Sequence, residues 1–263
     1  MLRPLFIEEI GADGVAWVTL TRPEVHNAFN EALITELTAM LEGFGSDERV
    51  RAVVLTARGR SFSAGADLEW MQRAAGYGEA ENLEDARRLA RLMSTLDSLP
   101  KPTLALVQGP AYGGGVGLIA CCDIALAAET ANFALSEVKL GLIPAVISPY
   151  LIAAIGRRAA RRYCLTGETF GAREALRLGL VHAVVPDEAL EDAGKKVLRA
   201  LMKGGPLAQT AAKDLILSVA GRPIDPALLE DCAARIARIR ATDEAREGIA
   251  AFLEKRKPRW LRD

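Results

Sequence analysis

The chain has 263 residues, half of them hydrophobic, and its 33 basic residues against 34 acidic ones leave a net charge of −1. This balance provides no overall basic field for nucleic acid. Cys121, Cys122, Cys164 and Cys232 do not follow a zinc-site spacing, so we expect free thiols, buried or half-buried, in a reducing compartment. Acidic residues follow the first residues too closely for a signal peptide, and no apolar run is long enough to span a bilayer. These two features predict a cytoplasmic protein.

The first half of the chain alternates strand and helix signals. Two β-rich runs, 5–10 and 15–20, flank a Gly-Ala-Asp-Gly turn and predict a hairpin. Asn30 is placed to cap a helix over 31–44. Further strands are predicted at 51–57, 103–107 and 124–128, and helices at 82–99 and 114–122. This order favours an α/β core with parallel strands.

The second half contains fewer strands. Pro144 suits the first position of a helix reaching residue 155, and a helix over 171–179 leads to a short strand ending at Val185. After Pro186 only helices are predicted, at 187–203, 206–219, 226–240 and 243–257. We therefore expect an α/β core over 1–185 and a helical region over 186–263. His182 has no evident partner in the sequence and is interpreted as structural.

Two glycine-rich turns each follow a strand and open a helix. The first is Ser61-Phe-Ser-Ala-Gly-Ala-Asp-Leu68, and the second begins at Gln108 and contains Gly113-Gly-Gly115. Small residues allow a tight turn and leave backbone N–H groups at a helix start uncovered. Two such turns can direct two N–H groups at one oxygen, which is the geometry of an oxyanion hole for a thioester carbonyl.

These motifs in this order resemble the enoyl-CoA hydratase/isomerase (crotonase) family. The matching residues are Phe62-Ser-Ala-Gly-Ala-Asp-Leu68 and Gly109-Pro-Ala-Tyr-Gly-Gly-Gly-Val-Gly117. The resemblance implies an α/β crotonase-like fold, with a spiral core of repeated ββα units and a helical C-terminal region. It also implies N–H donors at Ala66 and Gly114, a catalytic acid at Glu137, a coenzyme A thioester as substrate, and no metal or redox cofactor.

The resemblance extends to substrate contacts and to assembly. It implies that the loop bearing Val25 and His26 lies against coenzyme A, and that Phe252 and Lys255 approach coenzyme A, often that of a neighbouring subunit. The other expected substrate contacts are Ala64, Asp67, Leu68, Tyr112, Gly113, Gly117 and Lys139. Trimers, often paired into hexamers, are implied, with the region 186–263 mediating assembly and covering the active site.

One departure from the family pattern concerns the reaction. Members that activate water with two glutamates carry the first of them where this chain has Gly117. Three outcomes stay open: Glu137 makes both proton transfers, another side chain such as Tyr112 or Glu69 holds the water, or the enzyme is a Δ3,Δ2-enoyl-CoA isomerase with a single base.

The acyl group is predicted from one further segment. Residues 135–150 look most like the bacterial methylglutaconyl-CoA hydratase branch, which favours hydration. The predicted substrate is 3-methylglutaconyl-CoA, or a related short or branched enoyl-CoA, in leucine or fatty-acid catabolism. A glutaconyl group carries a distal carboxylate that needs a cation, and Lys139 is the candidate.

Parts of the sequence are compatible with other interpretations. Gly115-Val-Gly-Leu-Ile-Ala120 fits the G-x-G-x-x-A pattern of an NAD-dependent oxidoreductase, although Gly109 to Gly114 intervene between it and the strand. A member that only binds coenzyme A or RNA is a further alternative. The stretch with Trp70, Met71 and Tyr77 is either a mobile cover over a substrate tail or a surface loop with a buried tryptophan.

Overall fold

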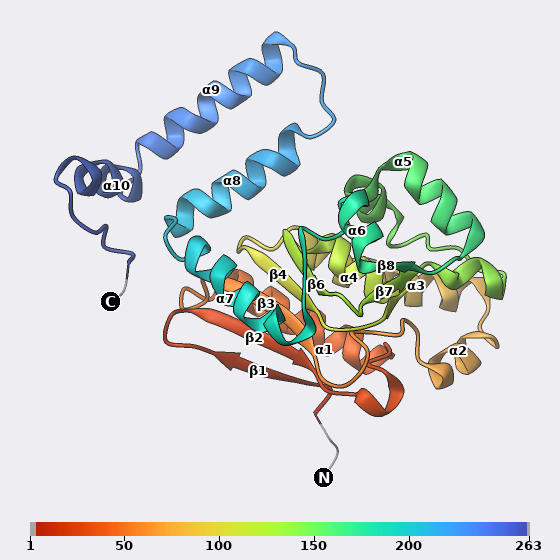
Figure 1. Ribbon diagram of the computed structural model, residues 1–263. Helices are drawn as coiled ribbons and strands as arrows, with labels where there is room; N and C mark the ends of the chain where they lie inside the picture. Colours follow the sequence, from red (N-terminus) through yellow and green to blue (C-terminus); the bar gives the residue numbers. More distant parts are fainter. Residues whose placement is uncertain (1–3, 262–263) are drawn as a thin grey trace.

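A computed structural model describes residues 4–261 of the chain, and a six-stranded sheet forms its centre (Figure 1). The order across this sheet is β1-β2-β3-β4-β6-β9, with β1 antiparallel to β2 and every other neighbouring pair parallel. The strands are β1 (Phe6–Ile10), β2 (Val15–Leu20), β3 (Ala52–Ala57), β4 (Thr103–Val107), β6 (Ile124–Ala128) and β9 (Ala183–Val185). The expected hairpin and parallel core are thus confirmed.

The two faces of this sheet are packed differently, because successive side chains of a strand point to opposite sides. On β3, Val53 and Leu55 face the main core, whereas Ala52 and Val54 face a smaller cluster. The main core is closed by α1 (Glu31–Ser46), α3 (Glu79–Asp97), α4 (Gly114–Cys121) and α5 (Ser148–Thr166). The smaller cluster is closed by Leu190 and Leu198 of α7 (Leu190–Leu201). Burial on both faces explains the unbroken apolar run of β4.

A second, three-stranded sheet lies between the main sheet and α5 and α6. Its order is β5-β7-β8, and the strands are β5 (Ala111–Tyr112), β7 (Asn132–Ala134) and β8 (Phe170–Gly171). The sequence did not predict this sheet, because two or three residues carry no usable hydrophobic period. The sheet matters for function, since β5 and β7 lead directly into α4 and into η2 (Ser136–Leu140), a short 3-10 helix.

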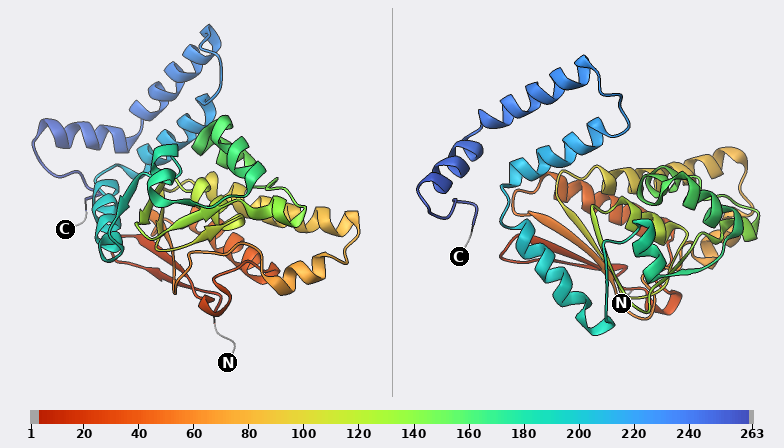
Figure 2. Two further views of the ribbon diagram at one scale, coloured as in Figure 1. Left: turned by 45° about the vertical axis from the view of Figure 1, so that its right-hand side comes forward. Right: turned by 45° about the horizontal axis from the view of Figure 1, so that its top comes forward.

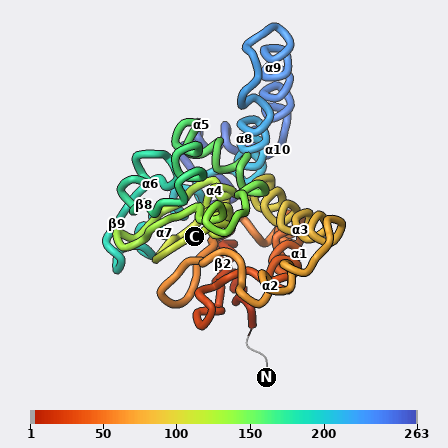
Figure 3. Tube along the Cα trace, turned by 90° about the vertical axis from the view of Figure 1, so that its right-hand side faces the viewer, coloured from red at the N-terminus to blue at the C-terminus, as the bar shows by residue number. Residues whose placement is uncertain are grey.

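The last three helices form an arm that projects from the core. They are α8 (Pro206–Val219), α9 (Pro226–Arg240) and α10 (Asp243–Leu253). Figures 2 and 3 show from further directions that α9 and α10 stand off from the rest of the molecule. The remaining elements are α2 (Leu68–Ala74), α6 (Ala172–Leu178), η1 (Pro23–Val25) and η3 (Asp187–Ala189).

Polar contacts fasten the base of this arm to the core. Lys213 of α8 forms an ion pair with Asp123 at 2.9 Å, and the Thr210 hydroxyl donates to the carbonyl of Pro100 at 2.6 Å. The exposed apolar side chains of α8 to α10 include Ile216, Leu229, Ile236, Ile249 and Phe252. The arm therefore exposes more apolar side chains to solvent than single, scattered surface residues would.

Several sequence predictions differ from the structure in their limits. The helix expected from Pro144 begins at Ser148 instead, and Gly156, with φ of 74°, interrupts it before it ends at Thr166. Residues 144–147 are irregular and serve the site described below. The region after Pro186 is helical as predicted, but α7 packs on the sheet, so the projecting arm begins only at α8.

Smaller expectations concern the cysteines, one histidine and membrane spans. All four cysteines are free thiols, Cys121 and Cys122 buried and the other two half-buried, as predicted. Nδ1 of His182 accepts a hydrogen bond from the N–H of Ala125 at 3.1 Å, which is the structural role expected. Within residues 4–261, no helix is both long enough and apolar enough to cross a membrane.

Candidate active site

Backbone hydrogen bonds join the two glycine-rich turns to one another. The carbonyl of Pro110 accepts from the N–H groups of Phe62 and Ser63 at 2.9 and 3.3 Å, and the N–H of Tyr112 donates to the carbonyl of Ser63 at 2.9 Å. These bonds continue the side-by-side pairing of the parallel strands β3 and β4 into the turns that follow them. The first turn is therefore fixed relative to the start of α4.

Two glycines allow the turns to approach closely. Gly65 has φ of 85°, and a Cβ atom on it would lie 3.0 Å from the carbonyl oxygen of Tyr112 and 3.8 Å from the nitrogen of Gly114. Gly113 has φ of 48°, also in the left-handed region that disfavours other residues. The turns thus bring the nitrogens of Ala66 and Gly114 to the same side of the molecule.

These two nitrogens have the character expected of oxyanion donors. Gly114 is the first residue of α4, where an N–H group has no partner within the helix. The neighbours of Ala66 are engaged, since Gly65 accepts from Phe29 and Asp67 donates to Phe29, but Ala66 itself makes no such bond among the described residues. Both line the same cavity, so two free N–H groups face one space.

The loop before α1 holds this arrangement in place. Phe29 packs its ring over Gly114, where an added Cβ atom would lie 2.6 Å from Cε2. Arg22 donates to the carbonyl of Ala28 at 2.5 Å and to the carboxylate of Asp67 at 2.7 Å. Asp67 also caps α2 by accepting from the N–H of Glu69. Burial favours a higher pKa for Asp67, but the hydrogen bonds from Arg22 and the backbone outweigh it and lower the pKa.

Glu137 faces the second turn from η2. Its Oε1 lies 2.9 Å from the position of a Cβ atom on Gly113, so only glycine allows this approach. Its Oε2 is buried and has no hydrogen-bond partner among residues 4–261. Burial raises the pKa of this carboxyl above its ordinary value of 4.5. A half-buried carboxylate that forms no ion pair and is harder to ionise is suited to proton transfer.

Gly117 is covered by an apolar side chain. A Cβ atom on Gly117 would lie 2.3 Å from Cγ2 of Ile147 and 3.2 Å from Cε of Met93. Ile147 is 2% exposed and belongs to the main core, and it also lines the cavity. The space in which a side chain from position 117 would extend toward the cavity is therefore filled by Ile147.

The residues that line the candidate site enclose a cavity of about 530 Å³. The two turns and the loop supply Phe29, Ala64, Gly65, Ala66, Gly113 and Gly114. α2 and α3 supply Leu68, Trp70, Met71, Ala86 and Leu89. The segment after β7 supplies Ser136, Glu137, Leu140 and every residue from Leu142 to Ile147. Apart from Glu137, Ser136 and the indole N–H of Trp70, which has no hydrogen-bond partner among the described residues, all these side chains are apolar or absent. Such a lining suits a thioester with a hydrocarbon chain.

The structure places the predicted site residues in two groups. Six of them line the cavity: Ala64, Ala66, Leu68, Gly113, Gly114 and Glu137. Gly117 and Asp67 lie just behind it and support its walls. Tyr112 donates its hydroxyl proton to Asn132 at 2.8 Å, and neither Tyr112 nor Glu69 lines the cavity, so neither is placed to hold a water there.

The other predicted contacts lie outside the cavity. Val25 is half-exposed, and Nδ1 of His26 lies 3.0 Å from the Ser61 hydroxyl, while the His26 carbonyl accepts from Ala64 at 2.9 Å. Lys139 lies along Gly167, its Cε 3.0 Å from the position of a Cβ there. Phe252, on α10, is 82% exposed, and Lys255 follows this helix. The helix α10 lies on the opposite side of the molecule from α2 (Figure 1).

Sequence reasoning did not identify Phe29, Ile147, Leu142 or Ile143 as site residues. Phe29 had a usable signal, because it follows the loop that the resemblance already placed near coenzyme A. Ile147 had none, because the helix predicted from Pro144 assigned it to regular structure. Trp70 is 7% exposed and lines the cavity, so neither of the two alternatives for its stretch described it fully.

The glycines of the dinucleotide-like pattern are packed inside α4. A Cβ atom on Gly115 would lie 2.6 Å from the carbonyl oxygen of Ser63, and Gly117 is covered by Ile147. Both glycines are buried, so no space is left at them for a pyrophosphate. The alternative of an NAD-dependent oxidoreductase is therefore wrong, and the pattern reflects close packing of α4.

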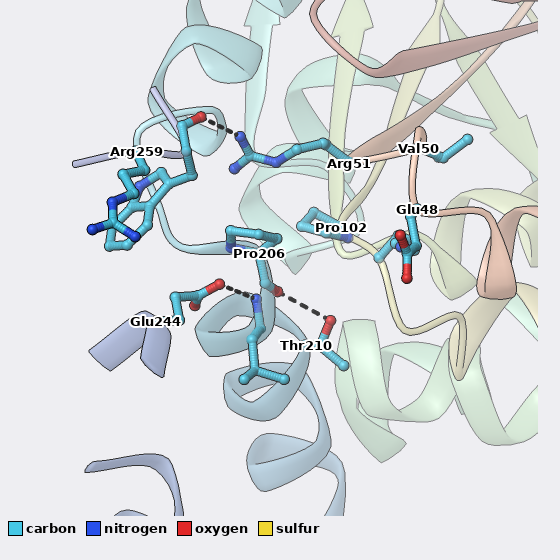
Figure 4. Close-up of a pocket in the computed structure, with 11 residues that line it drawn as sticks. Glu48, Val50, Arg51, Pro102, Pro206, Thr210, Glu244 and Arg259 are labelled. Carbon is cyan, nitrogen blue, oxygen red and sulfur yellow. Dashed lines mark hydrogen bonds between the residues drawn. The ribbon is translucent and has the colours of Figure 1, made fainter. Parts of the chain in front are cut away.

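A second cavity, of about 500 Å³, lies where the arm joins the core (Figure 4). Arg51 donates to the carbonyls of Gly204 and Trp260 at 2.7 and 3.1 Å, and the carboxylate of Glu244 accepts from the N–H groups of Leu207 and Ala208 at the start of α8. These polar groups connect segments of this chain to one another. The cavity is therefore interpreted as part of the joint between core and arm.

Comparison with known proteins agrees with this geometry. A family model described as enoyl-CoA hydratase/isomerase matches residues 11–263. An enoyl-CoA hydratase from Shewanella pealeana has a similar structure, with a TM-score of 0.95 and 48% identity over 98% of this chain and 96% of that one. A 2,3-dehydroadipyl-CoA hydratase of Escherichia coli is 34% identical over 93% of this chain and 94% of its own length. A hydroxycinnamoyl-CoA hydratase-lyase of Pseudomonas fluorescens is 35% identical over 76% and 74%.

Proposed function

The chain belongs to the enoyl-CoA hydratase/isomerase family, and from that premise we propose that it adds water to an α,β-unsaturated acyl-CoA with Glu137 as its only catalytic carboxylate. The observation that carries the proposal is the position of Glu137 in the cavity. Its Oε2 has no hydrogen-bond partner among the described residues, burial raises its pKa, and it lies in the same cavity as Ala66 and Gly114, whose N–H groups have no backbone acceptor.

The two N–H groups would bind the thioester oxygen. Hydrogen bonds to this oxygen stabilise the enolate and make the β-carbon of the enoyl group electrophilic. In other enzymes, loss of one such donor costs about 3 kcal/mol of transition-state stabilisation. The donors are backbone groups held by the turns and by the Arg22–Asp67 pair, so they need no rearrangement when charge develops.

Glu137 would perform both proton transfers of the addition. Its carboxylate accepts a proton from water as the oxygen of that water bonds to the β-carbon, and the pair of electrons of the double bond moves into the enolate. The carboxylic acid then returns the proton to the α-carbon, and the enolate collapses to the thioester. A pKa above the ordinary value helps the second transfer, because the acid form is easier to populate.

Ile147 favours one alternative reaction. Since Ile147 covers Gly117, the second polar group that would orient a water is replaced by hydrocarbon. A Δ3,Δ2-enoyl-CoA isomerase needs only one base, which removes a proton at one carbon and returns it two carbons away. Glu137 is suited to that reaction as well, and isomerisation is therefore the second candidate function.

The acyl group is the finer part of the proposal. The sequence of residues 135–150 supports 3-methylglutaconyl-CoA, or a related short or branched enoyl-CoA, and with it a place in leucine or fatty-acid catabolism. Related proteins include one named for a carboxylated acyl group, dehydroadipyl, and one named for an aromatic group, hydroxycinnamoyl. The choice depends on what the cavity offers to a distal carboxylate.

A trimer or a pair of trimers is proposed as the working assembly. The exposed apolar side chains of α8 to α10 support it, because in a single chain they would remain in water. Phe252 and Lys255 would then lie near coenzyme A of a neighbouring subunit, and Val25 and His26 near that of their own. The reaction as proposed needs no metal or redox cofactor, and a cytoplasmic location remains a prediction.

Mass spectrometry of the products distinguishes the two reactions. A 2-enoyl-CoA that gains the mass of one water shows hydration, and the use of ¹⁸O-labelled water shows that the new oxygen comes from solvent. A 3-enoyl-CoA that changes retention time at constant mass shows isomerisation. Hydration as the faster of the two supports the proposal; isomerisation alone would replace it with the second candidate.

A further inference from the structure

The end of the cavity that receives the acyl chain is largely apolar, and its one polar side-chain group is Nε1 of Trp70, which has no hydrogen-bond partner among the described residues. The thioester oxygen is bound near Ala66 and Gly114, and Glu137 faces the adjoining carbons, so the acyl chain continues away from the turns. The remaining lining residues come from α2, α3 and the segment 140–147. We name this part of the cavity the acyl groove and define it by Trp70, Met71, Leu89, Leu142, Ile143 and Ile147.

The acyl groove opens to solvent at its outer end. Leu142 and Ile143 are 56% and 72% exposed although both line the cavity, and Leu68, on the facing rim, is 73% exposed. Its inner end is closed by Ile147, which is 2% exposed and rests on Gly117. A chain can therefore run past Glu137 and along apolar side chains without meeting an end wall.

Glu137 is the one ionisable side chain among the described residues that line the cavity. The basic residues of the surrounding elements are engaged elsewhere: Arg73 with Glu31, Arg87 with Glu84, Arg88 with Asp85, and Arg91 with Glu42. Lys139 lies along Gly167 and does not line the cavity. A carboxylate at the end of an acyl chain would thus enter a largely apolar groove near an anion. Nε1 of Trp70 could donate one hydrogen bond to it, but no cation among the lining residues would compensate its charge.

We propose that the acyl groove selects an uncharged, apolar acyl chain of more than four carbons and discriminates against a chain that ends in a carboxylate. This inference rests on the proposed function for the identity of the thioester, and it departs from the acyl group that the sequence of residues 135–150 supports. It disfavours 3-methylglutaconyl-CoA, and it assigns the specificity to Leu142, Ile143 and Ile147.

Binding of unreactive, saturated acyl-CoAs tests the groove without depending on the reaction. We would measure the Kd of butyryl-, octanoyl- and suberoyl-CoA by calorimetry, with the intact protein in its natural assembly. Each buried methylene contributes up to about fourfold in affinity, so octanoyl-CoA should bind at least about tenfold more tightly than butyryl-CoA. Suberoyl-CoA, which has the same number of carbons and a terminal carboxylate, should bind at least about tenfold more weakly than octanoyl-CoA.

Two results would overturn the inference: equal affinity for butyryl- and octanoyl-CoA, or suberoyl-CoA binding as tightly as octanoyl-CoA.

A lysine variant tests whether the acyl chain binds along the residues that define the groove. Ile143→Lys should weaken the binding of octanoyl-CoA and strengthen the binding of suberoyl-CoA, because the new cation lies on the groove. Leu165→Lys is the matched control, since Leu165 is also 72% exposed but lies on α5 outside the cavity, and it should leave both constants unchanged. An Ile143→Lys protein with unchanged constants would contradict the assignment.

A parallel hydration assay with 2-octenoyl-CoA separates the two proposals. Selective binding of octanoyl-CoA without turnover of any enoyl-CoA would support the selectivity proposed for the groove and contradict the proposed function. Turnover that favours 3-methylglutaconyl-CoA over 2-octenoyl-CoA would support the proposed hydratase function and contradict the selectivity proposed for the groove.

Discussion

Ile147 occupies the space above Gly117, with its Cγ2 2.3 Å from the point where a Cβ atom on Gly117 would lie. The two residues are 30 positions apart in the sequence, and each makes the other necessary. Because Gly117 has no side chain, α4 would leave a hole in the core if Ile147 did not fill it. If residue 117 were larger than glycine, Ile147 would be displaced into the cavity. The absence of a second carboxylate is thus built into the packing of the site.

Gly117→Ala should destabilise the protein through this contact. Even one methyl group overpacks the site, and we expect a loss of about 1–3 kcal/mol in the free energy of unfolding, measured by urea denaturation. The double variant Gly117→Ala/Ile147→Ala should recover part of that loss relative to Ile147→Ala alone. Gly43→Ala, at a helical glycine with nothing within 4 Å, is the control and should be neutral or stabilising. Equal effects at Gly43 and Gly117 would refute the packing account.

Asp67→Asn should weaken both stability and activity. The Arg22–Asp67 pair is largely buried, with side chains 14% and 8% exposed, so neutralising one partner leaves a buried cation and costs about 3 kcal/mol. Thermal unfolding gives the stability, and kcat/KM should fall because the turn bearing Ala66 loosens. Glu84→Gln removes an exposed pair with Arg87, whose side chains are 66% and 58% exposed for Arg87 and Glu84, and should change neither quantity.

The same pair predicts a pH dependence. Because the pKa of Asp67 is lowered in the folded protein, its contribution to stability is present above the ordinary value of 3.8 and is lost as the pH falls through the folded value. The stability difference between wild type and Asp67→Asn should therefore shrink from about pH 4 downward. A difference that stays constant from pH 6 to pH 3 would argue against an ionised Asp67.

Glu137→Gln should stabilise the protein at neutral pH while it removes activity. The folded pKa of Glu137 is raised, so its carboxyl favours folding below the ordinary value of 4.5, and this contribution is lost as the pH rises through the folded value. Above that value the wild type carries a half-buried charge with no ion-pair partner among the described residues, and glutamine lacks this charge. The Tm of the variant should thus exceed that of the wild type at pH 7, with the difference decreasing toward pH 4. A lower Tm at pH 7 would be the contrary result.

Ile216→Glu should disrupt the proposed assembly. Ile216 of α8 is 65% exposed in the single chain, and a charge there would oppose burial against another subunit. Light scattering after size-exclusion chromatography should give a trimer or hexamer for the wild type and a smaller mass for the variant. Lys196→Glu on α7, an exposed position outside the arm, should leave the mass unchanged. A monomeric wild type would remove the proposal.

Local signals in the sequence predicted most of the elements, because those elements have strong local causes. α8 and α9 begin at Pro206 and Pro226, as predicted, since proline suits the first turn of a helix. Asn30 caps α1 through the N–H of Leu33, as its position indicated. The parallel sheet followed from the alternation of apolar strands and amphipathic helices.

The walls of the cavity could not be predicted in the same way. The turns carrying Ala66 and Gly114 are marked by glycines, and both residues line one cavity in the structure. Ile147 and Ile143 act through contacts with residues distant in the sequence, and no local period distinguishes a core isoleucine from one that lines a site. Pro144 was misleading, because proline is as compatible with an irregular turn as with the start of a helix.

The most direct test of the central claim is the loss of enoyl-thioester absorbance on adding the protein to 2-octenoyl-CoA and, separately, to crotonyl-CoA. Glu137→Gln and Glu69→Gln are measured in parallel, since Glu69 is an exposed glutamate outside the cavity. The account predicts turnover by the wild type and by Glu69→Gln, with kcat lowered at least about a hundredfold in Glu137→Gln. A Glu137→Gln enzyme that keeps its activity would contradict the assignment of Glu137 as the catalytic carboxylate.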